Sequence, residues 1–135
     1  MSEATSGDRA KTIAVGTARL GAPIDREVLA RLRGLQGEDE PDIVAELAGV
    51  FLKDARSRLQ SVEVALQKGD APSVERAAHM LKGGSGSLGA TVMSGLCAQL
   101  ENAGASGDLS RARLLLGRIR EELGQVDRAL EAEVS

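Results

Sequence analysis

Cysteine, histidine and aromatic residues are almost absent from this chain. Its 135 residues include one cysteine, Cys97, one histidine, His79, and one aromatic residue, Phe51. A single cysteine forms no internal disulfide, and one cysteine with one histidine is too few ligands for a structural zinc site. A single aromatic residue provides no stacking platform for bases, flavins or sugars. We therefore expect a chain that binds no metal or cofactor itself and that works in the reducing cytoplasm.

A basic excess and long apolar runs are also missing. The formal net charge is -3, whereas a nucleic-acid-binding surface normally carries an excess of Lys and Arg. No run of about eighteen consecutive apolar residues occurs, and the N-terminal stretch has no apolar run of signal-peptide length. We expect no nucleic-acid partner and no membrane partner, so a protein or a small molecule is the better candidate.

Residues 1–23 differ in composition from the rest of the chain. They are rich in Ser, Thr, Gly and Ala and show no sustained periodicity, which is typical of a flexible tail or linker. The alternative is that Ile13, Val15 and Leu20 dock as a short extra element. The chain is long enough for one domain with its own core and too short for two, and we place that domain at residues 24–135.

Two helices are predicted in the first half of this domain. Asp25 is a predicted N-cap, and the short helix after it ends near Gly37. A long amphipathic helix then runs from about Pro41 to Gly69, because proline suits a first turn and glycine an end. Their apolar stripes are Val28, Leu29, Leu32 and Leu35 in the first helix, and Val44, Leu47, Phe51, Ala55, Leu59, Val62 and Leu66 in the second.

Three further signals divide the second half into helices. Asp70 starts a helix that Gly89 interrupts, the next helix runs to the sequence AGASGD, and Asp108 caps the last one. No segment alternates in the manner of a strand. The predicted fold class is all-α, an antiparallel up-down-up-down four-helix bundle with a short additional N-terminal helix covering one end.

The only histidine lies in the glycine-rich stretch AAHMLKGGSGSLGA, residues 77–90. The positions that share one direction to within about 40°, at about 100° per residue, are Val74, Ala78, Leu81, Ser85 and Leu88. These residues define the core face. His79 points about 140° away from it and is therefore predicted to face solvent, with Lys82 beside it at i+3. Gly83 and Gly86 lie on the same face as the histidine.

Glycine is a poor residue for the interior of a helix. Gly83, Gly84 and Gly86 each cost roughly 0.5 to 1 kcal/mol relative to alanine, on the order of 2 kcal/mol together. An exposed face without side chains lets another macromolecule come close to the imidazole, which gives the glycines a use. The alternative is a frayed helix end leading into a turn, although Leu88 keeps the core phase beyond the glycines.

His79 lacks the partners that a metal site or a catalytic triad needs. Cys97 is interpreted as a small core residue. A surface histidine without a chemical role is the plain alternative, but a single exposed imidazole can still act as a nucleophile toward phosphorus. The cation of Lys82 favours the neutral form of the imidazole and offsets the charge of an arriving phosphoryl group.

The pattern AHMLKGGSGSLGA resembles the signature of the histidine phosphotransfer (HPt) domain family, usually AHxLKGxxxxxGA. The similarity extends from about Ile24 to Leu130 through the segments LQGEDEP, ELAGVFLKDARSRL and LCAQLE. Many members have Ser-Ser or Ser-Ala after the Lys-Gly pair, where this chain has Gly84 and Ser85. The resemblance implies a four-helix bundle that relays phosphoryl groups in two-component signalling.

The resemblance also implies roles for individual residues. His79 would accept a phosphoryl group from the aspartyl phosphate of a receiver domain and pass it to another receiver, while Lys82 would stabilise the phosphoryl oxygens. Glu101, on the following helix, would orient the imidazole through a hydrogen bond, or it is a surface charge. The receiver is expected to bring Mg²⁺, because phosphoryl transfer depends on charge neutralisation, and this chain is expected to bind no cofactor.

Partner contacts are expected around the histidine. Gly83 and Gly86 would leave room for the loops of the partner, and Arg76, Met80 and Arg58 would form a docking rim. The implied partners are receiver domains of response regulators or hybrid sensor kinases. We expect a monomeric phosphoryl carrier rather than a turnover enzyme.

Two rival interpretations come from other functional classes. A phosphate-independent adaptor would bind or sequester a receiver or kinase, but such a protein has no need of His79, Lys82 and Gly83 together. A dimerising kinase hairpin would need an ATP-binding domain, for which the chain has no room, and GxxxxGK[ST] is absent. Which receiver donates, and whether the chain is free-standing or part of a larger sensor kinase, stays open.

Overall fold

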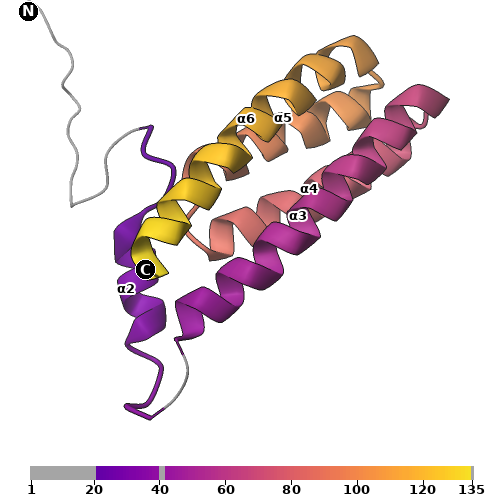
Figure 1. Ribbon diagram of the computed structural model, residues 1–135. Coiled ribbons are helices and arrows are strands. Elements are labelled where there is room, and N and C mark those ends of the chain that lie inside the picture. Colours follow the sequence, from indigo (N-terminus) through magenta and orange to yellow (C-terminus); the bar gives the residue numbers. More distant parts are fainter. Residues whose placement is uncertain (1–20, 40–41, 135) are drawn as a thin grey trace, which may run out of the picture.

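The computed structural model describes residues 21–39 and 42–134, and this part of the chain is all-α. Its helices are α2 (Arg26–Arg33), α3 (Ile43–Lys68), α4 (Ala71–Ser87), α5 (Thr91–Ser106) and α6 (Leu109–Val134). Figure 1 shows α3 to α6 running alternately up and down side by side, with α2 at the end where the chain terminates. The predicted four-helix bundle with a short N-terminal helix is confirmed.

Aspartate side chains begin the helices by accepting hydrogen bonds from free backbone N–H groups. Asp25 accepts from Glu27 N at 3.0 Å, and Asp70 accepts from Ser73 N at 3.2 Å. Asp108 accepts from Arg111 N at 3.1 Å. The predicted caps Asp25 and Asp108 and the predicted helix start at Asp70 are confirmed. Each aspartate satisfies a donor that the helix itself leaves without a partner.

The core of the bundle is aliphatic and lies between α3, α4, α5 and α6. The fully buried large side chains include Leu81, Met93, Leu100, Ile119 and Leu130. Cys97 is buried among them, as predicted, and burial raises the pKa of its thiol to about 12. Its position indicates a packing residue, since a reactive cysteine needs access to solvent and a lowered pKa.

Two of the predicted core positions are wrong. Leu35 is 77% exposed because α2 ends at Arg33, two residues earlier. Leu47 is 39% exposed, and Ala48 is buried in its place. At about 100° per residue, position 48 lies about 40° from Val44 and position 47 about 60° from it on the other side. The longer side chain therefore lies at the margin of the apolar stripe.

Helix α2 is held against the turn between α4 and α5. Gly89 has a left-handed backbone, with φ 82, and its carbonyl oxygen accepts a hydrogen bond from Asp25 N at 2.8 Å. A Cβ atom at Gly89 would lie 3.0 Å from both Asp25 O and Val28 Cβ. Glycine is required there by conformation and by space. The contact attaches the short helix to one end of the bundle.

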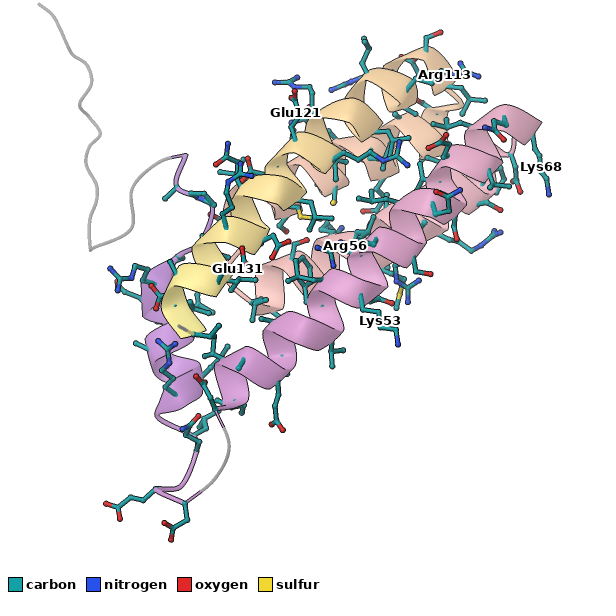
Figure 2. The ribbon with its side chains drawn as sticks, in the orientation of Figure 1. Lys53, Arg56, Lys68, Arg113, Glu121 and Glu131 are labelled. Carbon is teal, nitrogen blue, oxygen red and sulfur yellow. The ribbon has the colours of Figure 1, made fainter. Side chains whose placement is uncertain are left out.

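Charged side chains cover the outside of the bundle. Lys53 and Lys68 on α3 and Glu121 on α6 project away from it (Figure 2). Arg56 on α3 instead reaches α6, where its Nη2 lies 2.8 Å from Oδ2 of Asp127. Among the described helices, none combines the length and apolarity needed to cross a bilayer.

The predicted tail, residues 1–23, falls almost entirely outside the described residues, which begin at Gly21. The three apolar positions considered there for a docking element, Ile13, Val15 and Leu20, lie outside them as well. The boundary between tail and bundle stays a prediction.

Candidate functional site

His79 lies on the outer face of α4, and 62% of its side chain is exposed. Its Nδ1 atom is 2.9 Å from Oε2 of Glu101, which projects from the neighbouring helix α5. The predicted orientation of His79 toward solvent is confirmed. The predicted proximity of Glu101 is also found, so the two helices together build the surroundings of the imidazole.

Lys82 contacts the same carboxylate. Its Nζ atom lies 2.7 Å from Oε1 of Glu101, so that one oxygen of Glu101 faces Lys82 and the other faces His79. Hydrogen bonds, first from Lys82 and then from His79, lower the pKa of the Glu101 carboxyl group. Glu101 is therefore ionised near neutral pH, and the lysine is placed one turn from the histidine, with the carboxylate between them.

This arrangement selects one tautomer of the neutral imidazole. An ionised carboxylate can only accept hydrogen bonds, so Nδ1 of His79 must carry the proton that it shares with Glu101. The other ring nitrogen, Nε2, then has a free lone pair. An exposed imidazole held in this way can present Nε2 as a nucleophile.

The glycine-rich segment remains helical. Helix α4 continues through Gly83, Gly84 and Gly86 to Ser87, so the alternative of a frayed end is wrong. Three hydroxyl groups donate to three successive backbone carbonyls of this segment: Ser85 to Leu81 O at 2.6 Å, Ser94 to Lys82 O at 3.1 Å and Ser87 to Gly83 O at 3.0 Å. These bonds supplement the ordinary helical ones where side-chain packing is missing.

The glycines face different surroundings. A Cβ atom at Gly83 would meet nothing within 4 Å, whereas one at Gly84 would lie 3.7 Å from the ring of Phe51. At Gly86 it would lie 3.5 Å from Oγ of Ser94. Gly83 therefore leaves open space one turn beyond His79, and Gly84 lies against α3.

A shallow pocket adjoins the histidine. Its lining residues are Glu75, Arg76, His79, Met80 and Glu101. Arg76 donates to Ser73 Oγ at 2.9 Å, and Met80 is half-exposed. The structure thus brings two of the predicted docking residues beside the imidazole. Arg58 is not part of this pocket, because it lies on α3 and pairs with Asp54 at 2.8 Å.

A second, apolar pocket lies between α3 and α4. It is lined by Leu47, Val50, Phe51, Asp54, Gly84, Ser87 and Leu88. Val50 is 69% exposed and Leu47 is partly exposed, so apolar surface continues around the glycine-rich segment. Exposed apolar surface of this kind is typical of interaction sites. The sequence pattern did not predict this pocket, because it placed Leu47 in the buried core.

Two contributors to the site were not found from the sequence. Ser94 fixes the carbonyl of Lys82 from across the helix interface. Gly104 is buried where α5 passes α4, although the segment AGASGD was interpreted only as a helix end. The pair of small residues Ala103–Gly104, about one turn after Glu101, could have indicated this contact, because small side chains allow helices to approach closely.

Comparison with known proteins identifies the class. The family model described as Hpt domain matches residues 46–129, and the chain belongs to this family. Proteins of the family take part in phosphotransfer relays of two-component signalling, where they interact with receiver domains.

Individual relatives agree with this assignment. Histidine-containing phosphotransfer protein 5 of Arabidopsis thaliana is 34% identical over 71 residues, which cover 50% of this chain and 45% of that protein, less than half its length. Pseudo histidine-containing phosphotransfer protein 2 of Oryza sativa subsp. japonica is 29% identical over 108 residues, covering 78% of this chain and 72% of the relative.

Solved structures show the same fold. Histidine-containing phosphotransfer protein B (HptB) from Pseudomonas aeruginosa PAO1 superposes with a TM-score of 0.75 at 34% identity, covering 84% of this chain and 95% of that chain. A putative histidine-containing phosphotransfer protein from rice gives a TM-score of 0.70 at 22% identity, covering 87% of this chain and 89% of that chain.

Proposed function

We propose that this chain is a phosphorelay intermediate. In this proposal, His79 accepts a phosphoryl group from the aspartyl phosphate of one receiver domain and passes it to another receiver, in a response regulator or a hybrid sensor kinase. The observation that carries the proposal is the contact of 2.9 Å between Nδ1 of His79 and Glu101, on a side chain that is 62% exposed. In the neutral ring this contact places the proton on Nδ1 and leaves Nε2 as the nucleophile.

The transfer step uses the Nε2 lone pair. This pair attacks the phosphorus atom, the bond from phosphorus to the aspartyl oxygen breaks, and the receiver regains its aspartate carboxylate. The proton on Nδ1 stays where it is, so the phosphorylated ring is an imidazolium. The negative charge of Glu101, 2.9 Å away, stabilises this cation. The return step to a second receiver follows the same path in reverse.

Lys82 supplies positive charge for the phosphoryl oxygens. Its ammonium group lies one turn from His79 and is 38% exposed, so it can turn from Glu101 toward an arriving phosphoryl group. The remaining charge neutralisation is assigned to Mg²⁺ in the receiver, since phosphoryl transfer depends mainly on positioning and electrostatics. The chain therefore acts as a carrier and needs no cofactor of its own.

Docking of the receiver is assigned to the surface around His79. Gly83 and Gly86 keep this surface low, and Arg76 and Met80 form its rim beside the shallow pocket. The apolar pocket between α3 and α4 continues the same surface. A receiver with an apolar helix face next to its phosphorylated aspartate suits this combination.

The test is phosphoryl transfer from a panel of purified receiver domains phosphorylated with labelled acetyl phosphate. We expect a label on this chain that is labile in acid and stable in base, as a phosphohistidine is. His79→Gln, checked for folding by circular dichroism, should take up no label. Full labelling of the His79→Gln variant would overturn the proposal.

A phosphate-independent adaptor is the second candidate. The relative from rice whose name includes the word pseudo keeps this candidate open. The presence of His79 with its contacts to Glu101 favours transfer. Tight binding of a phosphorylated receiver, with the phosphoryl group remaining on that receiver, would support the adaptor instead.

A further inference from the structure

The backbones of helices α4 and α5 lie in close contact where Gly104 passes Glu75. Gly104 is buried, and a Cβ atom there would lie 2.7 Å from the backbone nitrogen of Glu75 and 2.9 Å from its Cα atom. Such distances are shorter than real Cβ contacts, so the two backbones lie directly against each other. No side chain separates the helices at this point.

This close approach is next to the candidate site on both helices. Glu75 precedes His79 by four residues on α4, and Gly104 follows Glu101 by three residues on α5. Each pair is about one helical turn apart, so its members share a face. A change in the spacing of the helices at Gly104 would therefore change the distance between the Glu101 carboxylate and the imidazole.

We propose that Gly104 is a positioning residue for phosphoryl transfer. Because it lacks a side chain, α5 approaches α4 closely enough for Glu101 to hold Nδ1 of His79 at 2.9 Å and Nζ of Lys82 at 2.7 Å. Gly104 contacts neither the histidine nor the phosphoryl group and acts through Glu101. This inference rests on the proposed function above.

Alanine at position 104 cannot be accommodated by a side-chain rotation. The atoms in its way belong to the backbone of Glu75, so one helix must move. Farther along the interface, Ser94 donates to Lys82 O at 3.1 Å and ties the helices together. Separation would therefore open the end at Gly104, where Glu101 lies only three residues away. Such hydrogen bonds normally span about 2.7 to 3.2 Å between donor and acceptor, so a shift of either helix would weaken both contacts of Glu101.

Gly95 provides the matched control. It lies on the same helix, is exposed, and would place a Cβ atom in open space. Gly95→Ala and Gly104→Ala make the same chemical change and offer the same gain in helix propensity. Only Gly104→Ala should displace the helices.

The first measurement is the tautomer of His79, observed as the ¹⁵N chemical shifts of the ring in NMR spectra across a pH titration. We expect the neutral ring of the unchanged protein and of Gly95→Ala to be protonated mainly on Nδ1. Gly104→Ala should shift the population toward Nε2–H, as Glu101→Ala should. An Nε2–H majority in the unchanged protein would overturn the inference, whether or not any variant folds.

The second measurement is the rate of transfer from a phosphorylated receiver. Gly104→Ala should lower it at least about tenfold, since misplacement by about 1 Å can cost a hundredfold, whereas Gly95→Ala should leave it unchanged. In a Glu101→Ala background, Gly104→Ala should add less than about a twofold loss, because both changes act on one contact. Unchanged tautomer and rate in Gly104→Ala would overturn the inference and leave the proposed function intact. Labelling of His79→Gln would overturn the proposed function and with it the role of Gly104 in transfer, while the tautomer would still report whether Gly104 positions Glu101 against His79.

Discussion

Replacing Gly83 with glutamine should change stability and phosphoryl transfer in opposite directions. Gly83 lies in the interior of α4, and a Cβ atom there meets nothing within 4 Å. Glycine costs about 0.5 to 1 kcal/mol relative to a good helix former, and glutamine is one of these. Gly83→Gln should therefore stabilise the bundle by about 0.5 kcal/mol, which raises Tm by roughly 1 to 4 °C. The new side chain also fills the open space one turn beyond His79.

The cost should appear in transfer. A receiver that must stand off by the width of a side chain loses the in-line geometry at Nε2 of His79, so the rate should fall at least about tenfold. Gly117→Gln on α6 is the matched control, because that glycine is also helical and open. The control should gain similar stability, measured by thermal unfolding, and transfer at the normal rate. A normal transfer rate in Gly83→Gln would refute the idea that Gly83 leaves space for the receiver to reach His79.

Three further predictions concern the bundle. Because burial raises the pKa of the Cys97 thiol to about 12, iodoacetamide should modify it only after urea unfolds the chain, and rapid native labelling would contradict its burial. Burial likewise raises the pKa of Glu122, so ionising this group in the folded state costs stability as pH rises above about 4.5. Glu122→Gln should therefore raise Tm more at neutral pH than in acid. An equal gain at both pH values would contradict the burial of a charged carboxylate as the cause. Gly89→Ala should destabilise the bundle by about 1 to 2 kcal/mol more than Gly69→Ala, measured by urea titration. Both glycines have positive φ, but only at Gly89 would the new methyl group meet Val28. Equal losses of unfolding free energy would show that the contact with Val28 adds no strain.

Much of the site followed from the sequence because it depends on positions along one helix. The periodicity of α4 placed His79 outward and Ser85 inward. In the structure this inward Ser85 donates to Leu81 O at 2.6 Å. The interval of three residues placed Lys82 beside the histidine. The geometry of a single helix is enough to predict such positions. The same geometry predicted most of the core positions of the bundle.

Relations between helices were harder to predict. The family resemblance implied that Glu101 contacts His79, but it gave no means of seeing that Lys82 shares the carboxylate. That contact depends on how closely α5 approaches α4, and the approach is governed by Gly104, which composition alone marks as a helix end. Leu47 was misplaced for a related reason, because the edge of an apolar stripe is fixed by the neighbouring helix.

The residues around the imidazole, from Glu75 to Gly104, form one continuous hairpin of α4 and α5. Contacts within this hairpin are local in sequence, so the geometry of the site is encoded by a segment shorter than the domain. Helices α3 and α6 mainly complete the core. Substitutions in α3 and α6 can change the stability of the protein, or the surface that contacts partners, without changing the contacts of His79. The chemistry of the site and the completion of the core thus depend on different pairs of helices.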